Sequence, residues 1–197
     1  MSFKINLLPQ KVINRMLDTN VLVTDCPISI DQMRLVDLEH YNFQDQLQHG
    51  QIIVNEKIAE STLNIFKNLF DLKFPIHRVI PIHEYGGDDN LSMADNNSSC
   101  FNFRKIEGTN IFSMHSYGLA IDINPIQNPY IVIKDDQTVE VHPKAAVEFL
   151  NRKNIRRGMV ESIVDVFKNN GIIEWGGNWN SPIDYHHFQV PRSQLDS

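Results

Sequence analysis

Two segments of this chain decide how its fold is interpreted, and they read Ser113-Met114-His115-Ser116-Tyr117-Gly118-Leu119-Ala120-Ile121-Asp122 and Asp184-Tyr185-His186-His187-Phe188. Two histidines and one aspartate, here His115, Asp122 and His187, can fill three positions of a tetrahedral zinc ion and leave the fourth for water. The second carboxylate, Asp184, can accept a proton from that water. The two segments therefore predict a zinc hydrolase.

The spacing between His115 and Asp122 fits a loop that leads into a strand. The two residues are seven positions apart, too far for one helical turn, and Gly118 permits a bend between them. Residues 120–123 alternate as a strand does, which places Asp122 on a defined face. Aspartate is depleted in strands, and a buried carboxylate without a partner is costly. A metal ion or a cationic partner is therefore expected beside Asp122.

The neighbouring histidines His186 and His187 need to be told apart. Adjacent side chains of a strand point to opposite faces, so only one of the two is expected to bind a metal. We choose His187, because Asp184 precedes it by three residues and completes the pattern. The other histidines have no comparable context and are interpreted as structural or surface residues; they are His40, His49, His77, His83 and His142.

Length and charge limit the class of protein. The 197 residues suit one domain, or one domain with a small extension, and 42% apolar residues suffice for an ordinary globular core. The formal net charge of −6 provides no basic footprint, so nucleic acid is not an expected partner. We interpret the local basic cluster at residues 152–157 as the solvated face of a helix.

Cys26 and Cys100 lie far apart without C-x-x-C spacing, which argues against a thiolate metal site. Two free thiols are favoured over a disulfide. The first residues lack the long apolar run of a signal peptide, and no stretch reaches membrane-spanning length. Two explanations stay open: the protein is cytoplasmic as made, or the chain begins after a signal that has been removed.

The pattern of apolar residues predicts an α+β fold, with helices packed on a small, largely antiparallel sheet. Residues 1–30 are expected to form an irregular N-terminal arm on a single domain of residues 31–197. Helices are expected at 57–72 and 159–169, and a long polar loop at 84–99. Strands are expected at 33–43, 52–54, 79–82, 120–123, 130–133, 138–141, 172–175 and 187–190.

These motifs also carry a resemblance. Ser-x-His-x-x-Gly-x-Ala-x-Asp at 113–122, Trp-Gly-Gly-x-Trp at 175–179 and Asp-x-x-His-Phe at 184–188 resemble, in this order, the VanY-like zinc peptidases. That family contains D-alanyl-D-alanine carboxypeptidases, dipeptidases and L-alanyl-D-glutamate endopeptidases, and it shares its fold with the hedgehog signalling domain. The resemblance covers residues 96–190, whereas the first 50 or so residues carry no motif of the family.

The resemblance implies that His115, Asp122 and His187 bind zinc and that Asp184 is the catalytic acid and base, a position where some members have glutamate. The family also uses an arginine upstream of the first histidine, to polarise the scissile carbonyl or to hold a substrate carboxylate. Arg104 is the candidate for this role, and a structural salt bridge is the alternative.

Three further residues are expected near the substrate. Ser113 can hydrogen-bond substrate or shape the loop before His115. Trp175 and Trp179 frame the turn before Asp184, and we expect them in a packed core or in the wall of the cleft rather than stacked directly on substrate. Trp179 is our candidate for contact with substrate. The two glycines between these tryptophans allow the backbone to approach the site closely.

The substrate implied by the resemblance is a peptidoglycan stem peptide that contains D-amino acids, and the site of action would be periplasmic or extracellular. Carboxypeptidase and endopeptidase activities share the same ligands, so the bond that is cut stays open. The main alternative is an inactive metal-containing cell-wall-binding module, in which His186 or Asp184 would close the site as a fourth ligand. Another alternative is a zinc amidase that acts on ordinary L-peptides. No oligomeric state is indicated.

Overall fold

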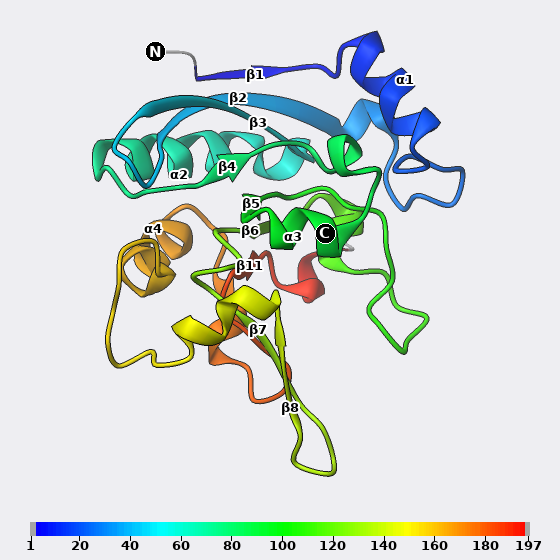
Figure 1. The fold of residues 1–197 in the computed structure, drawn as a ribbon. Coiled ribbons are helices and arrows are strands. Elements are labelled where there is room, and N and C mark those ends of the chain that lie inside the picture. Colours follow the sequence, from blue (N-terminus) through cyan, green and yellow to red (C-terminus); the bar gives the residue numbers. More distant parts are fainter. Residues whose placement is uncertain (1–2, 196–197) are drawn as a thin grey trace.

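The computed structural model describes residues 3–195 of the chain. Its N-terminal half is built on a sheet with strand order β1-β2-β3, whose two pairings are both antiparallel. Helix α2 lies along one face of this sheet, between it and the C-terminal half (Figure 1). The elements are β1 (Lys4–Asn6), β2 (Met33–Tyr41), β3 (Leu47–Asn55) and α2 (Ala59–Asp71).

Apolar side chains of β2 point alternately to the two faces of this sheet, and both faces are covered. Val36 and Leu38 face α2, and both are buried in the same cluster as Phe66 of the helix. Leu35, on the opposite face, joins a second buried cluster. The strand predicted at 33–43 and the helix predicted at 57–72 are both confirmed, although the first helical turn is a 3-10 turn.

The N-terminal segment contains regular structure rather than the irregular structure that we expected. β1 extends the sheet at its edge, and α1 (Gln10–Asp18) follows it. Met16 of α1 is fully buried in the second cluster together with Leu35 and Phe101. Burial of such side chains typically stabilises a fold by about 1.5–3 kcal/mol each, which explains why this short helix packs on the sheet.

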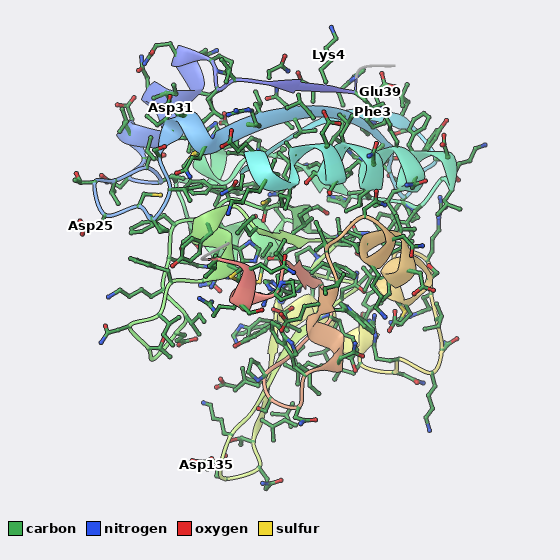
Figure 2. All side chains as sticks on the ribbon, turned by 180° about the vertical axis from the view of Figure 1, so that it is seen from behind. Phe3, Lys4, Asp25, Asp31, Glu39 and Asp135 are labelled. Carbon is green, nitrogen blue, oxygen red and sulfur yellow. The ribbon has the colours of Figure 1, made fainter. Side chains whose placement is uncertain are left out.

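The C-terminal half contains two further antiparallel sheets, with strand orders β6-β11-β9 and β10-β7-β8. The predicted hairpin is confirmed as β7 and β8, and it extends away from the body of the molecule with Asp135 at its tip (Figure 2). The strands are β6 (Ala120–Asp122), β7 (Tyr130–Ile133), β8 (Val139–His142), β9 (Glu174–Trp175), β10 (Ile183–Asp184) and β11 (His187–Gln189).

One core joins the two halves. Helix α4 (Val164–Asn169) contributes Phe167, whose ring stacks on Phe188 of β11 at a centroid distance of 3.8 Å. The same buried cluster includes Ile121 of β6 and the apolar face of α2. The strands that carry the expected metal ligands are therefore backed by the core that also supports the first sheet.

The sheets and the segment between β4 (Arg78–Val79) and β6 also differ from the expectation. The single sheet is replaced by separate small sheets, and the stretch 84–99 is not an unstructured loop. It contains α3 (Asp89–Ala94), whose first turn is capped by the Asp88 side chain, and β5 (Asn97–Ser98), which pairs in parallel with β4. The strand expected at 79–82 is thus cut short, because a 3-10 turn begins at Ile82.

The remaining short elements are 3-10 turns that connect the strands and helices. They are η1 (Ile30–Gln32), η2 (Glu56–Ile58), η3 (Ile82–Tyr85), η4 (Met114–Tyr117), η5 (Lys144–Phe149), η6 (Val160–Ile163), η7 (Gly176–Asn178) and η8 (Arg192–Gln194).

The basic cluster at 152–157 is not the solvated face of a helix. Arg152 is half-buried, pairs with Glu161 at 2.6 Å, and lies over the ring of Tyr185 at 4.3 Å. It also donates a hydrogen bond to the side chain of Asn128. Arg152 therefore holds structural segments together, which a helical interpretation of the cluster missed.

Two findings concern the thiols and the helices. Cys26 and Cys100 are both free, the first half-exposed and the second buried. Among residues 3–195, none of the helices combines the length and the apolar character that a membrane crossing requires.

Gly118 provides a test of how the two halves are joined. Gly86 and Gly118 both end a 3-10 turn in the left-handed conformation, with φ of 64° and 63°. An added Cβ would meet nothing at Gly86, but at Gly118 it would lie 2.7 Å from the backbone nitrogen of Asn55. We expect Gly86→Ala to cost about 1 kcal/mol from conformation alone. Gly118→Ala should cost about 1–3 kcal/mol more, because the overlap must be relieved.

Urea denaturation of the two variants measures this difference directly. Equal losses of unfolding free energy would mean that the close approach between Gly118 and Asn55 does not constrain the fold.

Candidate metal centre

His115 is placed by a short turn that the surrounding sequence holds at both ends. The side chain of Ser113 caps η4 by accepting a hydrogen bond from the His115 backbone N–H. At the other end Gly118 adopts positive φ, and its carbonyl accepts a hydrogen bond from Asn55 at 2.9 Å. The turn that carries His115 is thereby anchored to the end of β3.

Asp122 is held at the end of β6 between two neighbouring segments. Its backbone exchanges hydrogen bonds with Ser99 on one side, at 2.8 and 3.1 Å. On the other side β11 pairs antiparallel with β6, and His187 stands directly opposite Asp122. Directly opposed residues of an antiparallel pair project on the same face, so this pairing brings the two side chains together.

The three expected ligands converge on one point. The His115 Nε2 atom lies 3.1 Å from Asp122 Oδ2 and 3.1 Å from His187 Nδ1, and Asp122 Oδ1 lies 3.0 Å from His187 Nδ1. Ligand atoms bound to zinc at 2.0–2.1 Å with tetrahedral angles are separated by about 3.3 Å. All three residues are buried, and this donor set fits a zinc ion.

Hydrogen bonds to the outer ring nitrogens select the tautomers that metal binding needs. His115 Nδ1 lies 2.6 Å from the carbonyl oxygen of Cys100, which can only accept, so the ring donates there. His187 Nε2 lies 2.8 Å from Gln189 Oε1 and donates in the same way. Once a metal ion has displaced the inner proton of His187, the lone pairs of His115 Nε2 and His187 Nδ1 would therefore point inward, as expected of metal ligands.

The Asp122 carboxylate and the neighbouring imidazoles stabilise each other's charged forms and so shift each other's pKa values. Burial by itself would raise the pKa of the Asp122 carboxyl, but the imidazoles of His115 and His186 hold it well below its usual range. Burial lowers the pKa of His187, but the hydrogen bond and the charge of Asp122 outweigh it and raise the pKa of His187 to about 9. His187 is therefore protonated near pH 7 until a metal ion displaces the proton.

Asp184 lies beside the ligands at the end of β10. Burial raises the pKa of its carboxyl, although the imidazoles of His186 and His187 act in the opposite direction. Its Oδ1 atom makes no well-aligned hydrogen bond among residues 3–195, and lies 3.1 Å from His186 Nε2. A buried carboxyl of this kind, next to a metal site, is suited to transfer protons.

His186 and His187 do not lie on opposite faces of one strand, as we had expected. His186 lies in a turn before β11, so the alternation of a strand does not apply to it. Its ring is buried and points to the same centre: Nδ1 contacts the Asn128 carbonyl at 2.7 Å, and Nε2 lies 3.9 Å from Asp122 Oδ2. His186 therefore lies between Asp184, at 3.1 Å, and the Asp122 carboxylate.

Arg104 lies in the segment before His115, and its backbone is bound by the hydroxyl of Ser116 at 2.6 and 2.9 Å. Its guanidinium Nε lies 3.3 Å from Asp89 Oδ2, which corresponds to the structural salt bridge expected as the alternative role. Burial raises the pKa of Tyr130, which lies opposite Asp184 across the β7–β10 pair, and the charge of Arg104 acts in the opposite direction.

The two tryptophans have different surroundings. Trp175 stacks on Phe188 and donates a hydrogen bond to the Tyr185 carbonyl. Trp179 lies against the His187 ring with centroids 5.3 Å apart. A Cβ at Gly176 would lie 2.5 Å from the Asp184 carbonyl oxygen, so the expected close approach of the backbone is confirmed there.

Several residues that support the centre were missed. Cys100 acts through its carbonyl, and no side-chain motif reports that. Tyr130 becomes visible only through the pairing of β7 with β10. Gln189 had a usable signal: two positions after His187 on a strand, it must lie on the same face.

Residues 107–190 match the family model described as D-alanyl-D-alanine carboxypeptidase. This part of the chain is therefore similar to the VanY-like peptidase family, and the match includes His115, Asp122, Asp184 and His187 but not Arg104. The family match identifies a peptidase, and a hydrolase in the broader sense. No curated protein and no solved structure was found to match the chain.

The geometry predicts that one zinc ion binds per chain and releases protons near pH 7, because His187 must lose its proton. His115→Ala should abolish this binding, whereas His49→Ala, at an exposed histidine, should not. At a free zinc concentration of 100 Kd, the unfolding free energy should rise by about 2.7 kcal/mol.

Calorimetric titration in two buffers with different ionisation enthalpies measures the stoichiometry and the protons released. Zinc binding by the His115→Ala variant with unchanged affinity would exclude this centre as the binding site.

Proposed function

We propose that this chain, through its VanY-like segment, is a zinc metallopeptidase that hydrolyses an amide bond in peptidoglycan stem peptides. The observation that carries the proposal is the convergence of His115, Asp122 and His187, whose ligand atoms all lie within 4.8 Å of one another. The buried carboxyl of Asp184 beside them argues for catalysis, since a purely structural metal has no use for a group that transfers protons.

Zinc held by His115 Nε2, Asp122 and His187 Nδ1 would supply Lewis-acid activation of water and of the scissile carbonyl. The protein contributes the arrangement around it. Cys100 and Gln189 orient the two imidazoles, and the core behind β6 and β11 keeps their separation constant. Such support keeps the ligands in place without reorganisation during the reaction.

Asp184 is proposed as the general base and then the general acid. It would accept a proton from the attacking water and deliver it to the departing amine. Its burial raises the pKa of the carboxyl, which brings the pKa closer to working pH and makes the return of the proton easier. The close approach of Gly176 restricts the backbone of Asp184, which favours a constant position for this short side chain.

Arg104, Ser113 and Trp179 are proposed as the substrate-binding residues. The guanidinium of Arg104 is partly exposed and its ion pair with Asp89 is made through Nε, so its fork would be offered to a substrate carboxylate or a developing oxyanion. Trp179 lies beside His187 and would form a wall of the cleft. Ser113 is buried and caps η4, so its contribution to substrate binding would be made through the position of that turn.

The substrate class follows from the family, and the scissile bond stays open between a D-alanyl-D-alanine carboxypeptidase and an L-alanyl-D-glutamate endopeptidase. We assign residues 31–197 to the peptidase domain and residues 1–30 to an arm on it. Residues 1–2 and 196–197 of these ranges lie outside the described part of the chain. The proposed site of action is periplasmic or extracellular, where peptidoglycan is found.

A second candidate function is a metal-containing cell-wall-binding module without activity. The observation that favours it is the position of His186, whose Nε2 lies 3.9 Å from Asp122 Oδ2 and could close the site as a fourth ligand. A metal with four protein ligands has no open position for catalysis.

The two candidates differ in the products they give. Zinc-loaded protein incubated with peptidoglycan and soluble stem peptides should release a terminal D-alanine, or cut between L-alanine and D-glutamate, as read by mass spectrometry. Asp184→Asn should retain zinc and lose about 10²–10⁴-fold in turnover, because proton transfer is removed while the ligands remain. Asp135→Asn at the hairpin tip is the matched control and should retain full turnover.

Near-normal turnover by Asp184→Asn would show that the base is another group. Zinc-dependent binding to peptidoglycan without any product would favour the binding module.

A further inference from the structure

We propose that Glu174 and Gln189 are positioning residues for His187, and that Glu174 links the metal centre to Trp179. This inference rests on the metal centre of the proposed function. It concerns the hydrogen bonds that lead outward from His187 through Gln189 to Glu174, a chain of groups that no motif of the sequence indicated.

The first link runs along β11. His187 and Gln189 are two residues apart on this strand, so their side chains project on the same face. Gln189 is 7% exposed, and its Oε1 lies 2.8 Å from His187 Nε2. An amide oxygen can only accept, so the ring proton of His187 resides on Nε2 and leaves Nδ1 free for the metal.

The second link determines which way the Gln189 amide points. Gln189 stands directly opposite Glu174 in the antiparallel pair of β11 and β9. Its Nε2 donates to Glu174 Oε2 at 2.9 Å. A carboxylate can only accept, so Glu174 holds the amide nitrogen on its side and turns the amide oxygen towards His187.

The third link leads from Glu174 to Trp179. Trp179 donates its indole N–H to Glu174 Oε1 at 3.2 Å, and its ring lies 5.3 Å from the His187 ring. Glu174 thus contacts His187 indirectly through both of its oxygens. One oxygen accepts from the amide of Gln189, which binds the His187 ring, and the other accepts from the indole of Trp179, which lies against that ring. Glu174 is therefore the group on which both the tautomer of His187 and the position of Trp179 depend.

This arrangement has a consequence for metal affinity. Without an acceptor at Nε2, His187 can carry its proton on Nδ1, which is the atom that must bind the metal. The loss of such an outer partner typically weakens metal binding about 10–100-fold. The same loss in Glu174 variants should also release Trp179, which reports its surroundings through its fluorescence.

The donor and acceptor in the hydrogen bond between Gln189 and Glu174 can be exchanged by mutation, which tests the direction of these hydrogen bonds. Gln189→Leu removes the acceptor and should weaken zinc binding about 10–100-fold. Gln189→Glu restores an acceptor for His187 but sets two carboxylates against each other, and should also weaken binding. The double variant Gln189→Glu with Glu174→Gln reverses the donor and acceptor between the two positions, and leaves both His187 and Trp179 with an acceptor. It should return the zinc Kd to within about threefold of the original value.

The zinc Kd is measured by competition with a chromophoric chelator, alongside circular dichroism melting of each metal-free variant. Glu140→Gln, which removes a carboxylate paired with Lys134 on the hairpin, is the control and should leave the Kd unchanged. Glutamine and glutamate have nearly the same shape, so the exchange leaves the packing unchanged. If the two residues only filled space, zinc affinity would not fall in Gln189→Glu and return in the double variant.

A Gln189→Leu variant that binds zinc within about twofold of the original protein would overturn the role of Gln189. If Gln189→Glu and the double variant bind zinc equally weakly, the role of Glu174 is overturned. The measurement does not depend on hydrolysis, so a protein that binds zinc normally but cleaves no stem peptide contradicts the proposed function alone.

Discussion

The antiparallel pairing of β6 with β11 is the constraint on which the rest of the centre depends. It sets Asp122 opposite His187, residues 65 positions apart in the chain, and puts both side chains on one face. One residue of slip in this register would turn His187 away from Asp122 and leave a buried carboxylate without its partner. The stack of Phe167 on Phe188 and the core behind β6 oppose such a slip, because it would expose Phe188.

The N-terminal half also fixes part of the metal centre, although it lies outside the segment that matches the family. The match covers residues 107–190, yet the turn that carries His115 is bound to Asn55 at the end of β3, and the carbonyl that orients His115 belongs to Cys100. The position of the first ligand therefore depends on segments that precede the match. This dependence is consistent with Gly118, which packs against Asn55 at the end of β3 and tolerates no side chain without a shift of its neighbours.

The three proposed ligands and most of the strands could be predicted from the sequence because both leave local patterns. A histidine, a glycine and an aspartate at fixed spacing describe a turn that enters a strand, and alternation along 120–123 and 130–133 reports the strands themselves. The segment 84–99 was mistaken for a loop because its helix is short and polar and depends on the cap of Asp88. The orientation of His186 and the contacts of Tyr130 and Glu174 arise from pairings between distant segments, and no local pattern encodes them.

The most direct test of this account is a crystal structure of the zinc-loaded protein, with the ion located by anomalous scattering at the zinc edge. The account predicts one peak about 2.0–2.2 Å from His115 Nε2, from an Asp122 carboxylate oxygen and from His187 Nδ1, with the fourth position open to solvent. A peak elsewhere would contradict the centre. A peak that is also bound by His186 or Asp184 would contradict catalysis, since the ion would have no position left for substrate or water.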